Sequence, residues 1–362
     1  MYRTFIRPIL FLFPPESVHK FVIRSIRLFF RIPGISALVG NVYTLRKPEL
    51  EREVFGLKFM NPVGLAAGFD KDAEIFNEFA SFGFSFIEAG TITPKAQPGN
   101  KKPRSFRLRA DKALINRMGF NNSGAEEAAK KLGSRKTNVI VGGNIGKNTV
   151  TENKDAADDY ARCFEALYDC VDYFTINISC PNINSLSELQ DKEMLAVIAS
   201  KITGIRKRMS VYRPVLVKIS PDLTEDQIDD VLDIIREYDL DGIIATNTSI
   251  GRKNLLTDKL ITDRIGKGGL SGRPIRDRSD EVIAYISNRT GGSLPIIGVG
   301  GIMTPGDAVR KLEAGASLVQ IYTGMIYRGP GLVKRINRKI LEVQHKTVTA
   351  EASAKSVIQH AE

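Results

Sequence analysis

The stretch that decides the fold is "PVLVKISPDLTEDQ", residues 214–227. Its first part, residues 214–219, is an almost continuous apolar run, which predicts a strand that is buried on both faces. Thr224 and the acidic residues behind it are typical of the beginning of a helix. A buried strand that leads into a capped helix is one unit of a parallel α/β sheet.

The same unit recurs along most of the chain. Short β-rich runs that end in glycine or small polar residues lie at 62–68, 85–91, 138–144, 173–179, 242–248, 294–301 and 317–323. Amphipathic stretches such as 152–170, 188–208, 224–238 and 305–314 lie between them. Eight such units are the number found in a TIM barrel, so the predicted fold class is α/β, a (β/α)8 barrel with a small N-terminal amphipathic helical extension. We expect three parts: residues 1–46, a barrel over 47–345, and a polar tail over 346–362.

The composition is that of an ordinary globular protein, with 43% hydrophobic and 26% charged residues. Cys163, Cys170 and Cys180 have neither metal-ligand spacing nor an even number for disulfides, and the three histidines are not clustered, so no metal site is predicted. The net charge is +11, but residues 1–48 contain eight Lys or Arg and one acid, or +7 of that total. Because the rest is nearly balanced, we expect no nucleic-acid partner.

The N-terminal segment is basic and apolar at once. On a helix over 16–31, Lys20, Arg24, Arg27 and Arg31 form one stripe and apolar residues occupy much of the other side. Neither this helix nor the short apolar segment before Pro14 is long enough to span a bilayer. Such a helix fits one that lies in the membrane interface. The alternative is that its apolar face packs on the barrel, and two short helices with an apolar slot between them would allow both.

In a TIM barrel the active site lies at the carboxyl ends of the strands. Those ends are rich in amides and hydroxyls, with two lysines and one cysteine: Lys71, Thr91, Asn144, Asn177, Cys180, Lys218, Thr246, Asn247, Thr248, Tyr322 and Thr323. No group of carboxylates is among them, which disfavours glycoside hydrolysis. Cys180 ends the run "TINISCPN", and the residues alone leave open whether it is a reactive thiol or a buried one beside a turn.

Three glycine-rich segments, 268–272, 298–302 and 321–324, are expected at one rim of the barrel. Bare backbone N–H groups at such loops bind phosphate, although each loop alone is also compatible with an ordinary turn. A phosphate site with many amides suggests flavin mononucleotide (FMN). Lys218 would then stabilise the negative charge that develops on the flavin during reduction, unless it is only a rim lysine paired with an acid.

A series of motifs then follows in order from about residue 50 to about residue 340: "GLAAGFDKDAE", "EAGTITPKAQPGNKKPR", "NRMGFNN", "GNIGKN", "NISCPN", "VKISPDL", "ATNT", "GGLSGRP", "GVGGI" and "LVQIYTG". Together they resemble dihydroorotate dehydrogenases. The N-terminal extension with "PPESVH" resembles the class 2 branch, which is membrane-associated and uses quinone.

The resemblance implies roles for individual residues. The positions that match FMN contacts are Ala67, Gly68, Phe69, Asp70, Lys71, Thr91, Asn144, Asn177, Lys218, Thr246, Gly272, Gly301, Tyr322 and Thr323. The positions that match orotate contacts are Lys71, Asn116, Arg117, Met118, Gly119, Phe120, Asn177, Asn182, Asn247 and Thr248. His19 and Arg107, with Tyr322, match positions that line the quinone tunnel.

Cys180 matches the family's catalytic base, which removes a proton from C5 of dihydroorotate. Class 2 members usually carry serine there, followed by Pro-Asn-Thr, whereas this chain has "SCPNI" as in the soluble class 1 loop, with Ile183 in place of the threonine. A thiol is far more acidic than a hydroxyl and needs less assistance. We therefore expect a class 2 body with a class 1-like base.

The resemblance implies oxidation of (S)-dihydroorotate to orotate by a monomer on the cytoplasmic side of a bacterial cell membrane, with membrane quinone as electron acceptor, in UMP biosynthesis. Three alternatives stay open: a dihydroorotate dehydrogenase that uses fumarate or NAD, another FMN-dependent barrel enzyme acting on a pyrimidine, and a catalytically silent peripheral membrane protein.

Overall fold

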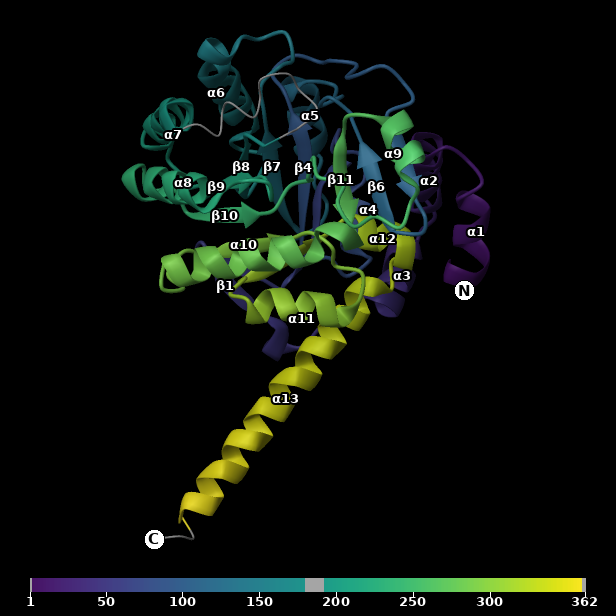
Figure 1. The fold of residues 1–362 in the computed structure, drawn as a ribbon, viewed down its shortest axis with the longest axis vertical. Coiled ribbons are helices and arrows are strands. Elements are labelled where there is room, and N and C mark those ends of the chain that lie inside the picture. The colour runs from purple at the N-terminus through teal and green to yellow at the C-terminus, as the bar shows by residue number, and fades with distance from the viewer. Residues whose placement is uncertain (1, 180–191, 360–362) are drawn as a thin grey trace.

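The computed structural model describes residues 2–179 and 192–359, with side chains as far as residue 346. Eight parallel strands close into a barrel in chain order: β3 (Val63–Asp70), β4 (Phe86–Ile92), β7 (Ile140–Ile145), β8 (Tyr173–Asn177), β9 (Val215–Ile219), β10 (Gly242–Ala245), β12 (Ile296–Val299) and β13 (Leu318–Ile321). Each coincides with one of the eight predicted runs, so the predicted (β/α)8 barrel is confirmed (Figure 1).

Helices connect successive barrel strands: α4 (Phe76–Ala80), α5 (Ala125–Leu132), α6 (Ala156–Leu167), α7 (Lys192–Arg206), α8 (Glu225–Glu237), α10 (Arg276–Arg289) and α11 (Pro305–Glu313). The short helix α12 (Thr323–Arg328) follows the last strand. The predicted helix starts are correct. Thr224 accepts a hydrogen bond from the backbone N–H of Gln227, and the Gln227 side chain accepts one from the N–H of Thr224. Thr304 and Asp307 form the same reciprocal cap on α11.

One end of the barrel interior is apolar and closed. The hairpin of β1 (Arg52–Val54) and β2 (Leu57–Phe59) precedes the first barrel strand, and the Phe59 ring meets the Phe86 ring edge-on at 5.2 Å. Tyr173, Leu216, Ile244, Ile297 and Leu318 fill the space around these rings. Because this end is packed with side chains, space for a ligand remains at the carboxyl ends of the strands.

Several elements beyond the eight units lie over that open end. β5 (Ser105–Leu108), β6 (Ala113–Asn116) and β11 (Gly269–Gly272) form an antiparallel sheet; α9 (Lys259–Ile265) precedes β11 and η5 (Arg273–Ile275) follows it, whereas η3 (Asn153–Asp155) leads into α6. The sequence did not predict this sheet. Residues 268–272 were expected to form a glycine loop, but Gly269–Gly272 pair with β6 as a strand.

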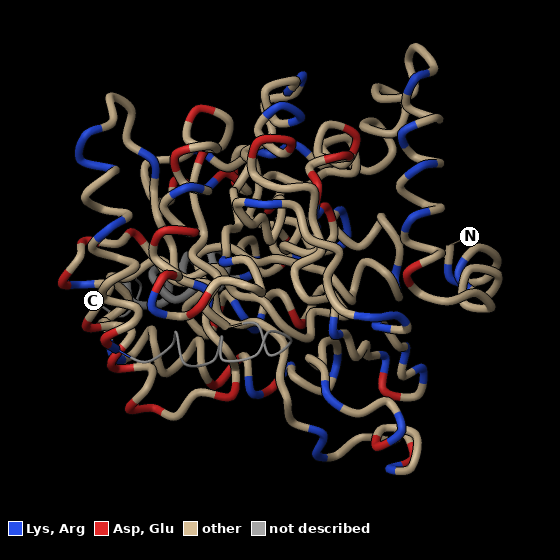
Figure 2. Tube along the Cα trace, turned by 90° about the horizontal axis from the view of Figure 1, so that it is seen from above, with Lys and Arg blue, Asp and Glu red and all other residues tan. Residues whose placement is uncertain are grey.

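The N-terminal segment folds as η1 (Tyr2–Ile6), α1 (Arg7–Leu10), α2 (Pro15–Phe29), α3 (Ile35–Tyr43) and η2 (Pro48–Leu50). Helices therefore lie on both sides of Pro14 and Pro15, as expected. Lys and Arg residues recur along α2 near the N-terminus (Figure 2). In the described part of the chain, no helix combines the length and apolarity that crossing a membrane requires.

The last helix, α13 (Leu332–Gln359), begins against α11 and then projects away from the barrel (Figure 1). The sequence suggested a tail after residue 346, whereas the helical backbone continues through Gln359.

Candidate functional site

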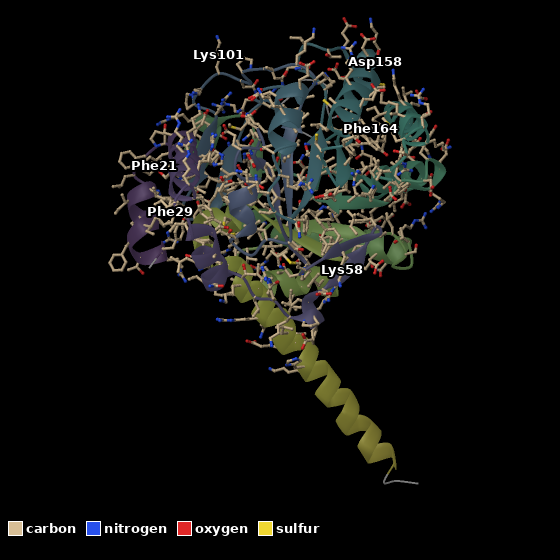
Figure 3. All side chains as sticks on the ribbon, turned by 180° about the vertical axis from the view of Figure 1, so that it is seen from behind. Phe21, Phe29, Lys58, Lys101, Asp158 and Phe164 are labelled. Atoms are coloured by element: carbon tan, nitrogen blue, oxygen red, sulfur yellow. The ribbon has the colours of Figure 1, made fainter. Side chains whose placement is uncertain are left out.

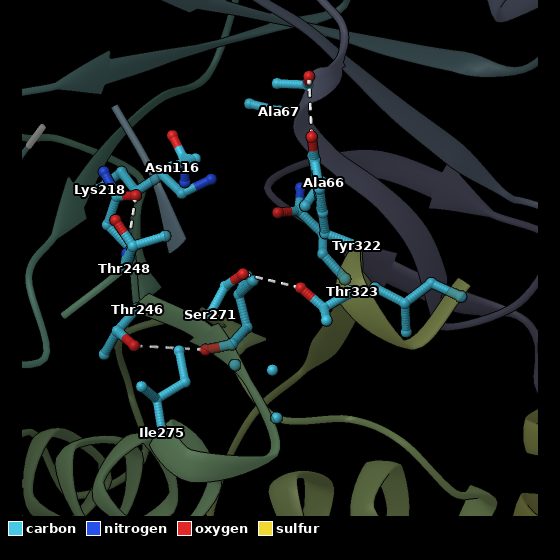
Figure 4. A pocket seen from close by; sticks show the side chains of 18 of the residues that line it. Ala66, Ala67, Asn116, Lys218, Thr246, Thr248, Ser271, Ile275, Tyr322 and Thr323 are labelled. Atoms are coloured by element: carbon cyan, nitrogen blue, oxygen red, sulfur yellow. Dashed lines mark hydrogen bonds between the residues drawn. The ribbon is translucent and has the colours of Figure 1, made fainter. Parts of the chain in front are cut away.

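A cavity with an empty volume of about 1030 Å³ opens at the carboxyl ends of the barrel strands (Figure 4). Most of the residues predicted to contact FMN or orotate line it: Ala67, Gly68, Lys71, Thr91, Asn116, Met118, Gly119, Phe120, Asn177, Lys218, Thr246, Asn247, Thr248, Gly272, Gly301, Tyr322 and Thr323. These residues come from most of the barrel strands and from β6 and β11, so the barrel brings together groups that lie far apart in the sequence.

The three glycine-rich segments meet at one side of this cavity. Gly272, Gly300, Gly301, Thr323 and Gly324 all line it, and the Ser271 and Thr323 hydroxyls lie 2.8 Å apart (Figure 4). Gly301 has φ +70°, and a Cβ there would lie 2.3 Å from Cβ of Arg276. Glycine is therefore required at this position by both the backbone conformation and the packing against α10. The resulting rim presents backbone and hydroxyl groups to the cavity.

Amide side chains form a connected group on the opposite wall. Asn177 Nδ2 donates to Thr91 Oγ1 at 2.8 Å, and Asn247 Nδ2 donates to Asn177 Oδ1 at 3.2 Å. Asn144 was predicted to contact the flavin, but it is fully buried behind this wall, where its side chain bonds Thr91 and Glu88. Asn144 therefore orients cavity residues and does not itself line the cavity.

Glu88 lies in the barrel interior directly below the cavity and was missed by the sequence reasoning. Its carboxylate is completely buried and lies 3.4 Å from the ammonium group of Lys218. Lys218 is therefore paired with an acid, as the alternative interpretation predicted. It also lines the cavity, so the pairing does not exclude a role towards a ligand. A signal for Glu88 existed, because "SFIEAGT" contains a charged residue inside an apolar strand.

Lys71 lies at the boundary of the cavity, where its ammonium group donates to the Gly68 carbonyl at 2.8 Å. Burial, followed by repulsion from the Arg104 guanidinium, lowers the pKa of Lys71 to about 8. A lysine with such a pKa is still mostly protonated at neutral pH. It can therefore attract an anionic ligand in a site of low polarity.

Three of the predicted residues face elsewhere. Asp70 caps the start of the next segment, since its carboxylate accepts from the N–H groups of Glu74 and Ile75, and burial raises its pKa to about 6. The Arg117 guanidinium donates to backbone carbonyls that include Ile265. Phe69 belongs to the wall of a second cavity. Cys180 and Asn182 lie outside the described residues.

This second cavity, with an empty volume of about 1350 Å³, lies between the N-terminal helices and the barrel. Val18, Val22 and Ile26 of α2 line it, whereas Phe21 and Phe29 of the same helix point outward (Figure 3). The helix thus presents apolar residues on two sides. The expected packing of an apolar face on the barrel is confirmed, and the exposed apolar residues leave the predicted membrane contact as a prediction.

His19 and Arg107 both line the second cavity. Burial and then the Lys71 ammonium lower the pKa of His19 to about 4, so its imidazole is uncharged at neutral pH. Its ring meets Phe69 edge-on at 5.0 Å. Arg107 donates to the Phe13 carbonyl at 2.6 Å and stacks on Phe11, with 4.5 Å from its guanidinium carbon to the ring centre.

The two cavities share a wall. Lys71, Asn116, Met118, Ser271 and Tyr322 line both of them. Tyr322 also donates to the Gly68 carbonyl at 3.3 Å, which joins the ends of β13 and β3 (Figure 4). A group bound in one cavity is therefore separated from a group in the other by a single layer of side chains. Among the described residues, no three His, Cys, Asp or Glu side chains are grouped as metal ligands.

Comparisons with known proteins agree with this arrangement. The family model described as "Dihydroorotate dehydrogenase" matches residues 49–343. The chain is 53% identical over 342 residues to "Dihydroorotate dehydrogenase (quinone)" from Christiangramia forsetii, covering 94% of this chain and 99% of the relative. It is 47% identical to the protein of the same name from Gloeobacter violaceus, covering 91% of each chain.

Solved structures give the same result. The crystal structure of ligand-free DHODH from Eimeria tenella superimposes with a TM-score of 0.83 at 36% identity, covering 92% of this chain and 96% of that one. The match of the family model over most of the chain, together with relatives that align along nearly their whole length, shows that the chain belongs to the dihydroorotate dehydrogenase family.

Proposed function

We propose that this protein oxidises (S)-dihydroorotate to orotate with FMN as cofactor and passes the electrons to a membrane quinone, as a step in the biosynthesis of UMP. The observation that carries the proposal is the pair of adjoining cavities. One is polar and lies at the ends of the barrel strands, and the other is mainly apolar and lies beneath the N-terminal helices. Relatives named as quinone-dependent support the acceptor.

The first cavity fits FMN in three respects. The glycine and hydroxyl rim, which includes Gly300, Gly301 and Thr323, offers donors for a phosphate. The amide wall and Lys218 offer hydrogen-bonding groups and a positive charge for the flavin ring. The buried Oε1 of Gln320 accepts no hydrogen bond from any described residue, which is expected of a group that a ligand satisfies. Members of the family are flavin-dependent.

Dihydroorotate is held beside the flavin by residues that complement its ring and its carboxylate. Asn116, Asn177 and Asn247 supply amide donors and acceptors, and the Lys71 ammonium pairs with the carboxylate. Cys180, as a thiolate, removes the proton from C5. FMN, when bound, supplies the acceptor for the hydride that leaves C6. Asn182 completes the substrate contacts as the resemblance implies.

The quinone occupies the second cavity. His19 is uncharged there and Arg107 is fixed on Phe11 and Phe13, so both are suited to bonding a neutral quinone oxygen. Residues 1–46 form the membrane and quinone-access segment, residues 47–345 the catalytic barrel and residues 346–362 a C-terminal segment. The protein is a monomer, bound peripherally to the cytoplasmic side of the membrane.

The experiment is an assay of dihydroorotate oxidation with a soluble quinone analogue, fumarate and NAD, each supplied separately to the purified protein. We expect turnover with the quinone, and one FMN per chain after denaturation. Turnover only with fumarate or NAD would replace the proposed acceptor. Release of FAD, or of no flavin, would contradict the proposed cofactor.

A further inference from the structure

We propose that Glu88 is the counter-ion that positions the Lys218 ammonium group in the wall of the first cavity and would thereby set the reduction potential of a flavin bound there. This inference rests on the proposed function, because it concerns the flavin that the first cavity is proposed to hold. Glu88 does not line that cavity, so its role is that of a positioning residue.

The carboxylate of Glu88 is held from four other barrel strands. Oε1 accepts from Asn144 Nδ2 at 2.7 Å and faces Lys218 Nζ at 3.4 Å. Oε2 accepts from Gln320 Nε2 at 2.7 Å and faces the Tyr173 hydroxyl at 3.4 Å. These partners belong to β7, β9, β13 and β8. The two short amide bonds determine where the carboxylate lies, and the lysine lies beside it at a longer distance.

Stability alone is a weak explanation for such a buried pair. Glu88 is fully buried and the side chain of Lys218 is only 5% exposed. Removing both charges from water costs several kcal/mol per ion, and their attraction often does no more than offset this cost. A well-packed apolar pair would hold the barrel at least as well. The charges therefore point to an electrostatic task near the cavity.

Two of the partners connect Glu88 to the cavity. Lys218 and Gln320 both line it, and Lys218 is seen in its wall in Figure 4. Gln320 donates to Glu88, which orients the amide and leaves its buried Oε1 without a donor among the described residues. This unsatisfied oxygen is independent of the ion pair. It indicates that Gln320, which bonds Glu88 through its Nε2, accepts a hydrogen bond from a ligand through its Oε1.

The sign of the effect follows from the charges. Reduction adds negative charge to the flavin, and a positive Lys218 close to it favours the reduced form. The negative Glu88 lies 3.4 Å from Lys218 without lining the cavity, and its charge weakens that field. Removing only the charge of Glu88, while Lys218 stays protonated, should therefore raise the reduction potential. We expect at least a tenfold increase in the ratio of reduced to oxidised flavin at a given ambient potential, which for two electrons corresponds to about 30 mV.

The experiment is an equilibrium redox titration of the flavin in the holoenzyme, with reference dyes, for wild type, Glu88→Gln and Asp159→Asn. Asp159 is the matched control. It is also a buried carboxylate, but it accepts from the Asn148 N–H at 2.9 Å and from the Thr151 hydroxyl at 2.7 Å. Support requires a raised potential in Glu88→Gln and an unchanged one in Asp159→Asn. An unchanged or lowered potential in Glu88→Gln, or an equal shift in both variants, would overturn the proposal.

A second variant keeps the test decisive if Glu88→Gln does not fold. Glu88→Asp keeps the charge but withdraws it from Lys218 by one methylene, so the potential should rise by less than in Glu88→Gln. No rise in Glu88→Asp would also overturn the proposal. The titration needs no substrate. A protein that binds flavin but does not oxidise dihydroorotate would therefore refute the proposed function without deciding this inference.

Discussion

Lys71 is a charged residue whose side chain lines both cavities. At the scale of single residues, the chemistry of the site follows from how burial changes the charge of such groups. Burial leaves His19 uncharged at neutral pH and brings the pKa of Lys71 down to about 8. An uncharged His19 suits a neutral ligand in the second cavity. Lys71, with a pKa of about 8, remains a cation at neutral pH and can attract an anionic ligand in the first cavity.

The affinity for orotate should therefore decrease as the pH rises through about 8. Below that pH the Lys71 ammonium is charged and attracts the carboxylate, and above it the group is neutral. The measurement is titration of the flavin absorbance with orotate between pH 6 and pH 10. In Lys71→Met the affinity should be weaker at pH 7, and this decline should be absent. An affinity of the wild type that stays constant across pH 8 would contradict the role of Lys71.

Replacing Cys180 by alanine should slow flavin reduction by dihydroorotate by about a hundredfold or more, the usual effect of losing a positioned base. Cys180→Ser should retain part of the activity with a higher pH optimum, and Ile183→Thr should partly rescue it. Stopped-flow measurement of flavin bleaching across pH checks this. Cys170→Ala is the matched control, since Cys170 is a partly buried thiol whose Sγ lies 3.5 Å from the Ala129 carbonyl. Reduction of Cys180→Ala at the wild-type rate would make Cys180 a packed thiol only.

At the scale of elements, the most buried ion pair between α2 and the barrel in the described part of the chain lies at the N-terminal end of the helix, where Glu16 meets Arg104. Arg104 donates to both carboxylate oxygens of Glu16, at 2.9 and 3.1 Å, and also to the carbonyls of Pro98 and Asn100. Partial burial opposes the charged form of Glu16, but the bonds from Arg104 and the nearby lysines outweigh it, and its pKa is lowered. This stabilisation is present above the ordinary pKa of a glutamate and is lost as the pH falls below it.

Glu16→Gln should loosen α2 and raise the KM for quinone several-fold, while flavin reduction by dihydroorotate changes little. We expect a loss of about 2 kcal/mol in the free energy of unfolding, since the change leaves Arg104 buried without its partner. Steady-state kinetics with a quinone analogue and denaturant unfolding measure the two effects. Arg27→Gln is the control, because Arg27 lies on the same helix and its exposed pair with Glu74, between β3 and α4, should contribute less than about 1 kcal/mol. Equal effects of the two variants would contradict a special role for Glu16.

At the scale of the whole molecule, one side of the protein combines positive charge with exposed apolar residues. The N-terminal segment carries the basic residues of α2, which recur along the tube in Figure 2, and exposed apolar side chains that include Leu12, Phe21 and Leu28, of which Phe21 is labelled in Figure 3. Residues of α2 thus line the second cavity on one side and, on another, form an exposed apolar and basic surface of the kind that lies in a membrane interface.

The triple substitution Leu12→Asp, Phe21→Asp and Leu28→Asp should therefore abolish binding to anionic lipid vesicles and leave the flavin content unchanged. These side chains are 74%, 63% and 66% exposed, so the fold should tolerate the change. Co-sedimentation with vesicles measures the binding. The matched control places aspartate at Val150, Val197 and Val211, which are exposed apolar residues outside the N-terminal helices. Equal binding by the two triple variants would contradict membrane contact through this surface.

The sequence by itself determined the barrel, the helices around Pro14 and Pro15, and most of the cavity residues. These features depend on local signals: apolar runs make strands, capping residues begin helices, and strand ends in a barrel meet at one rim. The surroundings of Phe69 and Asp70 did not follow from local signals. Gly68 lines the first cavity, whereas Phe69 lines the second and Asp70 accepts from the backbone of the segment before α4, in a part of β3 where the pairing with β4 is irregular.

Only the tertiary structure decided the antiparallel sheet over the site, the shared wall of the two cavities and the network around Glu88. Each of these depends on contacts between residues that are distant in the chain. Glu88 and Gln320, for example, are 232 positions apart and meet because β4 and β13 both face the barrel interior. No local sequence pattern predicts a hydrogen bond between these two side chains. The closure of the barrel brings the two side chains together, since it positions every strand relative to all the others.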